Sequence, residues 1–407
     1  MGWKADHMSQ EDNSASGVEK IGLTIAACSC AVLAVGSLLD LRMLFLLAAA
    51  AVISIVMWQV CDPFSEASQW IGKHYKIPGS VRGATLDAIA SSMPELFSGI
   101  FFVWIAFQAD DKTHVGSEGF GSTIATCAGS AVYNMILIPA SVALVVSFRR
   151  KKNPIVQVER EVVKRDGLWF LVCEAILLFF LYRQEIQWWA SLVFVALYFL
   201  YVMHLRRDAR RYRKETGNGQ EDGGSNNPDQ KASVLFGCFE IRLSVATSWL
   251  IILVATILVA TACYFLVEVT RETAVYFKIP TFFVAVILAA AVSSVPDTLI
   301  SIGSAMRGDD GGAVSNAFGS NIFDICICLS IPLVIGSYLM DWEPVSLQQD
   351  GKPIPGLMGL CVLLWILTAV TLFIIWHKRQ VTRGKAILLC GLYLVFVAWA
   401  VMGSLEN

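Results

Sequence analysis

Long apolar segments separated by short polar ones run through nearly the whole 407-residue chain. An apolar segment of about 18 to 25 residues predicts a transmembrane helix, because the bilayer interior holds no water for exposed backbone groups. We expect spans near residues 21–38, 42–60, 80–107, 120–148, 166–183, 187–204, 244–268, 280–306, 313–338, 356–376 and 386–402. The pattern therefore predicts an all-α polytopic membrane protein of about eleven transmembrane helices.

The first of these segments, 21–38, follows a polar stretch and fits either a signal anchor or a cleaved signal peptide. No small-residue cleavage site stands out, so we expect a retained extra helix ahead of the others.

Charged clusters between the spans orient the helices. Basic clusters occupy 149–152, 204–214 and 377–385, whereas the connections 109–119 and 341–353 are acidic. With eleven spans and a cytoplasmic N-terminus, every basic cluster falls inside and both acidic connections fall outside, which satisfies the positive-inside rule.

Composition supports the membrane assignment. Hydrophobic residues make up 56% of the chain, the mean hydropathy is +0.61, and only 16% of residues are charged, against about 25% in soluble domains. Most of the 11 cysteines lie in apolar runs, where a free thiol behaves as a small hydrophobe, and their spacing matches neither a zinc nor a redox motif.

A long polar stretch divides the chain into two halves. Residues 218–230 are rich in Gly, Asn and Asp, as in a flexible linker. We expect a polar cytoplasmic N-terminus at 1–20, an extra helix or signal anchor at 21–41, a first repeat domain at 42–204, a cytoplasmic linker at 205–240 and a second repeat domain at 241–407.

The two halves repeat one another. SSMPE at 91–95 returns as SSVPD at 293–297, and YKIP at 75–78 returns as FKIP at 277–280, both with numbers 202 higher. GSAVYN at 129–134 returns as GSNIFD at 319–324. The predicted topology gives the matching helices opposite directions. This is the inverted repeat of two five-helix halves found in secondary transporters, whose sites lie at the midplane.

Glu95 and Asp297 lie inside apolar spans, where a carboxylate costs about 2.5–3.5 kcal/mol or more. Such a group is kept where it faces a cavity or binds something. Pro94 and Pro296 precede these acids, and each frees a backbone carbonyl one turn earlier. A helix-end carboxylate and a simple kink are the structural alternatives, but two equivalent pairs favour a site.

Other oxygen-bearing side chains share these helices or follow on the next helix of each half. Hydroxyls three or four residues before an acid lie on its helix face, although small residues also serve helix packing. The candidates are Ser91, Ser92, Ser293, Ser294, Ser130, Ser320, Asn134, Asn321 and Asp324. An oxygen-rich set without His or Cys suits a hard cation such as Ca²⁺.

These blocks resemble the two α repeats of the cation/calcium exchanger superfamily. The first is GATLDAIASSMPELFSGI at 83–100 with GSAVYN, and the second runs from 293 to 325. SVPDT, AVSN and GSNIFD look like the potassium-dependent sodium/calcium exchangers. The resemblance implies alternating access, with sodium moving down its gradient to drive calcium the other way at one site.

The resemblance also implies roles for single residues. Glu95 and Asp297 would hold calcium or sodium, the serines and Asn134 would add oxygens, and Asp324 and Asn321 would be potassium candidates. The first repeat departs from the family pattern GATFMAAGSSAPE by placing Asp87 where an apolar residue is usual. Asp87 is therefore an extra ion ligand, a proton carrier or a vestibule carboxylate.

Three functions compete on this reading. Sodium/calcium exchange, with potassium dependence as an open feature, is favoured over a proton-coupled cation antiporter. The proton-coupled calcium exchangers of this superfamily commonly carry GNxxE motifs, which this sequence lacks. A channel or non-transporting scaffold is disfavoured by the inverted repeat with its midplane carboxylates. No nucleophile–base set indicates an enzyme. We expect no cofactor and no nucleic-acid partner, the lipid bilayer and transported Ca²⁺, Na⁺ and K⁺ as partners, and the plasma membrane as the default location.

Overall fold

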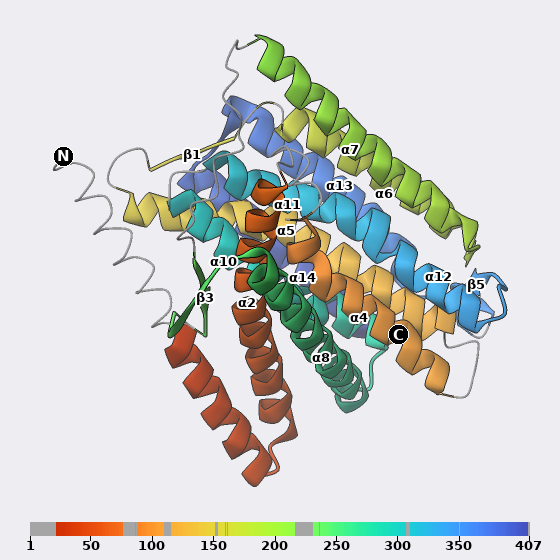
Figure 1. Cartoon of the computed structure of the whole chain (residues 1–407). Coiled ribbons are helices and arrows are strands. Elements are labelled where there is room, and N and C mark those ends of the chain that lie inside the picture. The colour runs from red at the N-terminus through yellow and green to blue at the C-terminus, as the bar shows by residue number, and fades with distance from the viewer. Residues whose placement is uncertain are drawn as a thin grey trace.

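The computed structural model describes residues 22–75, 86, 88–109, 115–150, 154–158, 160, 162–215, 231–235, 237–306, 310–349 and 351–405. The linker segment 218–230 therefore lies outside the described residues. The structure is an all-α polytopic membrane protein built as an inverted repeat of two five-helix halves with an extra helix at its N-terminus (Figure 1).

Helices account for nearly all of the described chain. The extra N-terminal helix is Gly22–Leu38. The first half contains α2 (Arg42–His74), α4 (Ala88–Gln108), η2 (Val115–Phe120), α5 (Gly121–Arg149), η3 (Val162–Asp166), α6 (Gly167–Tyr182) and α7 (Trp189–Glu215). The second half contains α8 (Val245–Phe277), α9 (Thr281–Val284), η4 (Ala285–Ala289), α10 (Ala290–Met306), α11 (Asp310–Phe323), η5 (Asp324–Cys328), α12 (Ser330–Leu339), α13 (Leu357–Trp376), η6 (His377–Arg379) and α14 (Arg383–Leu405).

Nine helical segments of the described chain are long and apolar enough to cross a membrane. The remaining two expected spans correspond to the short apolar helix Gly22–Leu38 and to α6, which has 16 residues. Helix α6 is preceded by the charged segment η3, which contains Lys164, Arg165 and Asp166, and carries Glu174 within it. Helix α6 therefore differs from the other predicted spans in its short length and in the charged residues that precede it.

Several predicted boundaries were wrong because helices continue past the apolar window. Helix α2 extends to His74 and α8 to Phe277, since polar residues at a membrane interface do not end a helix. The expected acidic connection 109–119 includes the buried π-helical segment η2. A side chain at Gly116 would overlap the Ser346 carbonyl, so this part of the connection packs tightly instead of forming an open loop.

Short two-stranded ladders join loops of the two halves. β1 (Val156–Gln157) pairs antiparallel with β8 (Gln380–Val381), and β2 (Glu185–Ile186) pairs antiparallel with β5 (Val345–Ser346). The predicted topology places the first pair inside and the second pair outside. Each ladder therefore joins two loops that the charge pattern assigns to the same side of the membrane.

The two other ladders are local hairpins. β3 (Lys231–Val234) pairs with β4 (Phe239–Arg242), and β6 (Gln348–Gln349) pairs with β7 (Lys352–Pro353). The β3–β4 hairpin packs on the end of α2, where Ala232 and Leu243 join Trp70 in a small buried cluster. Part of the expected linker 205–240 is therefore folded against the first half.

The long helices α2 and α8 lie side by side, and each also contacts a helix that carries an acidic motif (Figure 1). Helix α2 contacts α10, and α8 contacts α4. Helix α5 also packs closely on η4 and α10, since a side chain at Gly129 would overlap the Val286 carbonyl of η4 and crowd Ala290 of α10. Each half therefore packs against the acidic helix of the other half.

Candidate functional site: a buried oxygen cluster between the repeats

The two repeated acids occupy equivalent positions in the core. Glu95 lies in α4 and Asp297 in α10, with only 1% and 2% of their surfaces exposed. Pro94 and Pro296 lie inside these helices without ending them. Each carboxylate is therefore held at a defined depth by a continuous helix that has lost one backbone hydrogen bond.

The carbonyl freed by Pro296 has a protein partner. This carbonyl belongs to Val292, four residues earlier, and it accepts a hydrogen bond of 3.1 Å from the Ser54 hydroxyl of α2. On the first-half side, the Cys263 thiol of α8 donates to the Pro94 carbonyl at 3.4 Å. The Val292 carbonyl is therefore part of helix packing and not a spare cation ligand.

Two hydroxyls link Glu95 of α4 to helices α5 and α10. Ser130 of α5 donates to Oε1 of Glu95 at 2.9 Å and shares a hydrogen bond of 2.8 Å with Ser294 of α10. The Asn134 amide also lies 3.4 Å from the Ser130 hydroxyl. The predicted ligands Glu95, Ser130, Ser294 and Asn134 thus form one connected group.

Asn321 joins this group from the second half. Its Oδ1 accepts from the Asn134 amide at 3.1 Å, and its own amide donates to the Ala131 carbonyl at 3.2 Å. Ala131 is the repeat counterpart of Asn321, so the second bond joins equivalent points of the two halves. Helices α5 and α11 are therefore fixed to each other beside the acids.

Asp324 lies where the second half departs from the first. Its counterpart Asn134 is inside the continuous helix α5, whereas Asp324 begins the π-helical segment η5 between α11 and α12. The expected continuous span 313–338 is thus interrupted. Segments of this type are frequent at functional sites. Asp324 is fully buried and accepts from the Cys328 thiol at 3.7 Å.

Three of the predicted serine ligands donate to their own helices. Ser91 donates to the Ala88 carbonyl at 3.3 Å, and Ser293 donates to the Ala290 carbonyl at 3.1 Å. Ser320 does the same with the carbonyl three residues before it, at 3.3 Å. A hydroxyl that donates its hydrogen keeps its lone pairs, so these oxygens retain the capacity to bind a cation.

Several buried polar atoms in and beside this cluster have no hydrogen-bond partner among the described residues. A buried polar atom without a partner is costly and calls for a ligand, an ion or water. These atoms are Ser92 Oγ, Glu95 Oε2, Ser98 Oγ, Asn134 Oδ1, Asp297 Oδ1, Ser301 Oγ and Asp324 Oδ2. They are all oxygens, which is the donor chemistry of hard cations.

The carboxylates are close enough to act on one another but do not form a compact metal cluster. The negative charges of Glu95 and Asp324 both repel a negative charge on Asp297. Because all three carboxylates are buried away from water, a bound cation would stabilise them strongly. Within the described part of the chain, no three His, Cys, Asp or Glu side chains together could hold a metal ion. A bound cation would therefore also need hydroxyl and amide oxygens.

Sequence reasoning missed Ser98, Ser301 and Ser54. Ser98 and Ser301 follow the acids by three and four residues, a spacing that places them on the same helix face and that could have been recognised. Ser54 belongs to a helix without an acidic motif, so no local pattern indicated its bond to Val292. Asp87 lies outside the described residues, and its repeat counterpart Ala289 is buried in η4.

Comparisons with known proteins match both halves of the chain. The family described as "Sodium/calcium exchanger protein" matches residues 41–206 and 247–402. Human sodium/potassium/calcium exchanger 4 is 31% identical over 37% of this chain and 22% of its own length. The chain thus matches less than a quarter of that relative. The Escherichia coli inner membrane protein YrbG is 25% identical over 82% of this chain and 89% of its own length.

Solved exchanger structures share the fold. The H⁺/Ca²⁺ exchanger CAX superposes with a TM-score of 0.61 at 17% identity, covering 96% of this chain and 94% of its own. The sodium-calcium exchanger NCX_Mj gives a TM-score of 0.52 at 19% identity, covering 85% and 96%. The family match over both repeats, together with this shared fold, places the chain in the sodium/calcium exchanger protein family, whose members are transporters and not enzymes.

Proposed function

We propose that this protein is a secondary active antiporter that exchanges sodium for calcium by alternating access. The observation that carries the proposal is the presence of buried Glu95 and Asp297 on equivalent helices of an inverted repeat. Each has an oxygen without a partner among the described residues. Transporters of this architecture place their substrate at the interface of the repeats. Family membership and the sodium- and calcium-exchanging relatives support this reading.

In this proposal, calcium binds to Glu95 and Asp297, and the surrounding hydroxyls complete its coordination. Ca²⁺ takes about 6–8 oxygen ligands, so two carboxylates alone do not suffice. The further ligands would come from Ser91, Ser92, Ser293, Ser294, Ser130, Ser320 and Asn134. Ser98 and Ser301, whose hydroxyls have no partner among the described residues, are additional candidates.

Competition for the same oxygens would couple the two fluxes. One divalent ion and several sodium ions neutralise the same negative charge, so they bind in turn and not together. Without a cation, buried carboxylates of like charge would make a change of access costly. The protein would then change access more readily with a cation in the site than with the site empty, and exchange would occur with little leak.

Potassium dependence is the finer part of the proposal, and it rests on Asp324 and Asn321. Asp324 adds a third buried carboxylate where the first half has an amide, and its Oδ2 has no partner among the described residues. This asymmetry gives the second half a place for an additional monovalent cation. The sodium/potassium/calcium exchangers among the relatives support the assignment.

Proton coupling is the competing proposal. It rests on Asp87, a carboxylate in the first repeat that has an alanine as its second-half counterpart. An extra acid in only one of the two repeats would offer a carrier for a proton in place of sodium.

The test is calcium uptake into proteoliposomes that contain the purified protein. Sodium-loaded vesicles are compared with vesicles that carry only an imposed pH gradient, each with and without external potassium. We expect uptake driven by sodium and increased by potassium. Uptake driven only by the pH gradient would overturn sodium coupling and make Asp87 the leading proton carrier.

The same proposal places the protein in the plasma membrane. Imaging of a tagged full-length chain beside plasma-membrane and organelle markers tests this location, and accumulation with an organelle marker would contradict it.

A further inference from the structure

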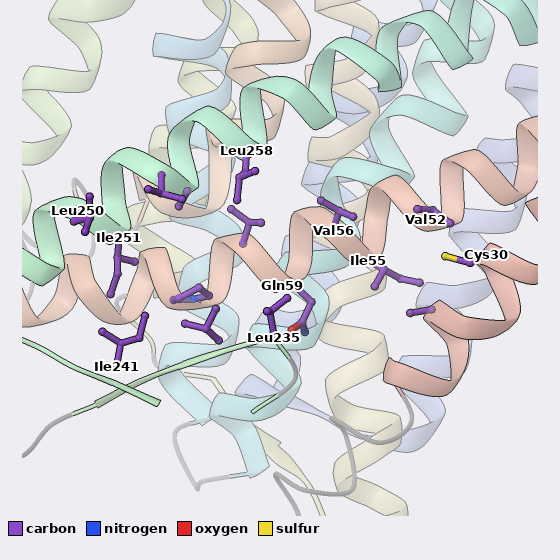
Figure 2. Close-up of a pocket in the computed structure, with 16 residues that line it drawn as sticks. Cys30, Val52, Ile55, Val56, Gln59, Leu235, Ile241, Leu250, Ile251 and Leu258 are labelled. Atoms are coloured by element: carbon purple, nitrogen blue, oxygen red, sulfur yellow. The ribbon is translucent and has the colours of Figure 1, made fainter. Parts of the chain in front are cut away.

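An apolar cavity lies between four elements of the described chain. Its walls come from the helix Gly22–Leu38, α2, α8 and the β3–β4 hairpin (Figure 2). Its volume is about 540 Å³, within the ~300–1,000 Å³ typical of ligand pockets. Elements from both halves, the N-terminal helix and the folded part of the linker therefore meet at this one cavity.

The chemistry of the cavity walls is that of hydrocarbon. Of the lining residues that the structure describes, Gln59 alone has a nitrogen or oxygen atom in its side chain, and Cys30 contributes a thiol. The other side chains are aliphatic, as Val56 and Leu258 in Figure 2 illustrate. A polar ligand would lose its hydration here with little return, so the cavity selects an apolar occupant.

The position of the cavity identifies the source of that occupant. Helices α2 and α8 are both long and apolar enough to span the bilayer. Val56, Leu250 and Leu258 line the cavity and are 41%, 59% and 45% exposed, so the cavity opens toward the lipid. The expected topology places the β3–β4 hairpin at the cytoplasmic end of α2 and α8, so the medium beside the helical walls of the cavity consists of acyl chains.

We propose that this cavity is a binding site for one acyl chain of a bilayer phospholipid. The chain would bridge the helix Gly22–Leu38 and the β3–β4 hairpin to the α2–α8 pair. This acyl chain would differ from those of the surrounding lipid because four protein elements line its binding site.

The cavity adjoins the helices that carry the acids. Ile55 lines it and follows Ser54, which bonds to the Val292 carbonyl of α10 at 3.1 Å. Ala255 lines it and precedes Thr256, whose hydroxyl lies 3.9 Å from the Met93 sulfur of α4. A chain in the cavity would thus press on the helices that hold Glu95 and Asp297 in register.

The test compares cavity-filling variants with matched controls. Val56→Trp and Leu258→Trp enlarge side chains that line the cavity, whereas Leu47→Trp and Leu253→Trp enlarge lipid-facing side chains of the same two helices outside it. The probe is a phosphatidylcholine with a photoreactive diazirine on one acyl chain, added to the detergent-purified full chain. Peptide mapping then locates the cross-links.

We expect cross-links on α2 and α8 within the cavity lining in the wild type and in both controls. In the two filled variants they should fall about tenfold, which corresponds to ~1.4 kcal/mol. Added phosphatidylcholine should also raise the Tm of the delipidated wild type and controls but not of the filled variants, because a ligand stabilises only a state that binds it.

Equal cross-linking in all four variants, or cross-links spread evenly over the lipid-facing surface, would overturn the site. A folding defect in a filled variant would appear as a lowered Tm before lipid is added, and the second filled variant then decides. No transported ion enters this assay, so its outcome does not depend on the proposed exchange activity.

Discussion

At the residue scale, the site is a set of oxygens whose repeat symmetry is broken at a few positions. Ser130 bonds to Glu95, whereas its counterpart Ser320 bonds to its own helix and leaves Asp297 Oδ1 without a partner among the described residues. Asp324 replaces the amide of Asn134. The two halves thus offer similar ligands but unequal charge, which suits a site that binds more than one kind of cation.

Asp324→Asn should reduce the dependence of calcium uptake on potassium. The change removes one negative charge and makes the second half match Asn134 of the first, so an additional monovalent cation loses its main attraction. The measurement is calcium uptake into sodium-loaded proteoliposomes over a range of external potassium concentrations. An unchanged potassium response would refute this role, as would a wild type that shows no potassium response at all.

Where the motifs repeat, the sequence predicted side chains that the structure brings together, and where they do not repeat it missed some of them. The repeated motifs identified both acids, the serines and Asn134, because each motif carries its own spacing. They could not show that Ser54 binds the Val292 carbonyl, since that bond joins residues 238 positions apart. The direction in which a hydroxyl donates is likewise set by packing and not by spacing.

At the element scale, the close contact between α5 and α10 depends on one glycine of a repeated pair. A side chain at Gly129 would overlap the Val286 carbonyl and would lie 2.8 Å from Ala290 Cβ. At Gly319, its counterpart, an added Cβ would meet no atom of the described residues within 4 Å. The same motif glycine is therefore required sterically in the first half and not in the second.

Gly129→Ala should destabilise the protein by about 1–3 kcal/mol, the typical cost of overpacking, and should impair exchange by separating α5 from α10. Gly319→Ala is the matched control and should keep a Tm close to that of the wild type. Thermal unfolding of the two detergent-purified variants measures the difference. Equal Tm values for both variants would show that the close approach is not required.

Helix positions were predictable from hydropathy, but helix interruptions were not. The apolar windows coincide with helices, and nine of these are long and apolar enough to cross a membrane, because the bilayer imposes a minimum length on a spanning helix. The π-helical segment at Asp324 lies inside one such window and leaves no mark on its hydropathy. Likewise, η2 lies in a stretch rich in glycine that resembles a loop, and its helical form depends on packing against other elements.

At the scale of the whole molecule, the charge pattern and the short ladders give the same sidedness. The β1–β8 ladder joins the loops beside the basic clusters at 149–152 and 377–385, whereas β2–β5 joins the opposite side, which includes the acidic connection 341–353. The expected topology places β1–β8 in the cytoplasm. Nothing in the hydropathy pattern could have predicted the pairing itself, since each strand has only two residues.

Cys238 reports this sidedness directly. It is an exposed free thiol in the β3–β4 hairpin, which the topology places in the cytoplasm. A membrane-impermeant maleimide should therefore label it in inside-out vesicles and not in right-side-out vesicles. A Cys238→Ser variant controls for other thiols, and labelling from the outside would reverse the topology.

The central claim is that Glu95 and Asp297 form the calcium site. The most direct test measures calcium uptake into sodium-loaded proteoliposomes by Glu95→Gln, Asp297→Asn and the control Glu174→Gln. Glu174 is also a buried membrane carboxyl, but it lies in α6 and accepts from Thr368 of α13 at 2.7 Å. We expect both site variants to insert and fold but to lose exchange, while Glu174→Gln transports like the wild type. Normal uptake by either site variant would contradict the claim.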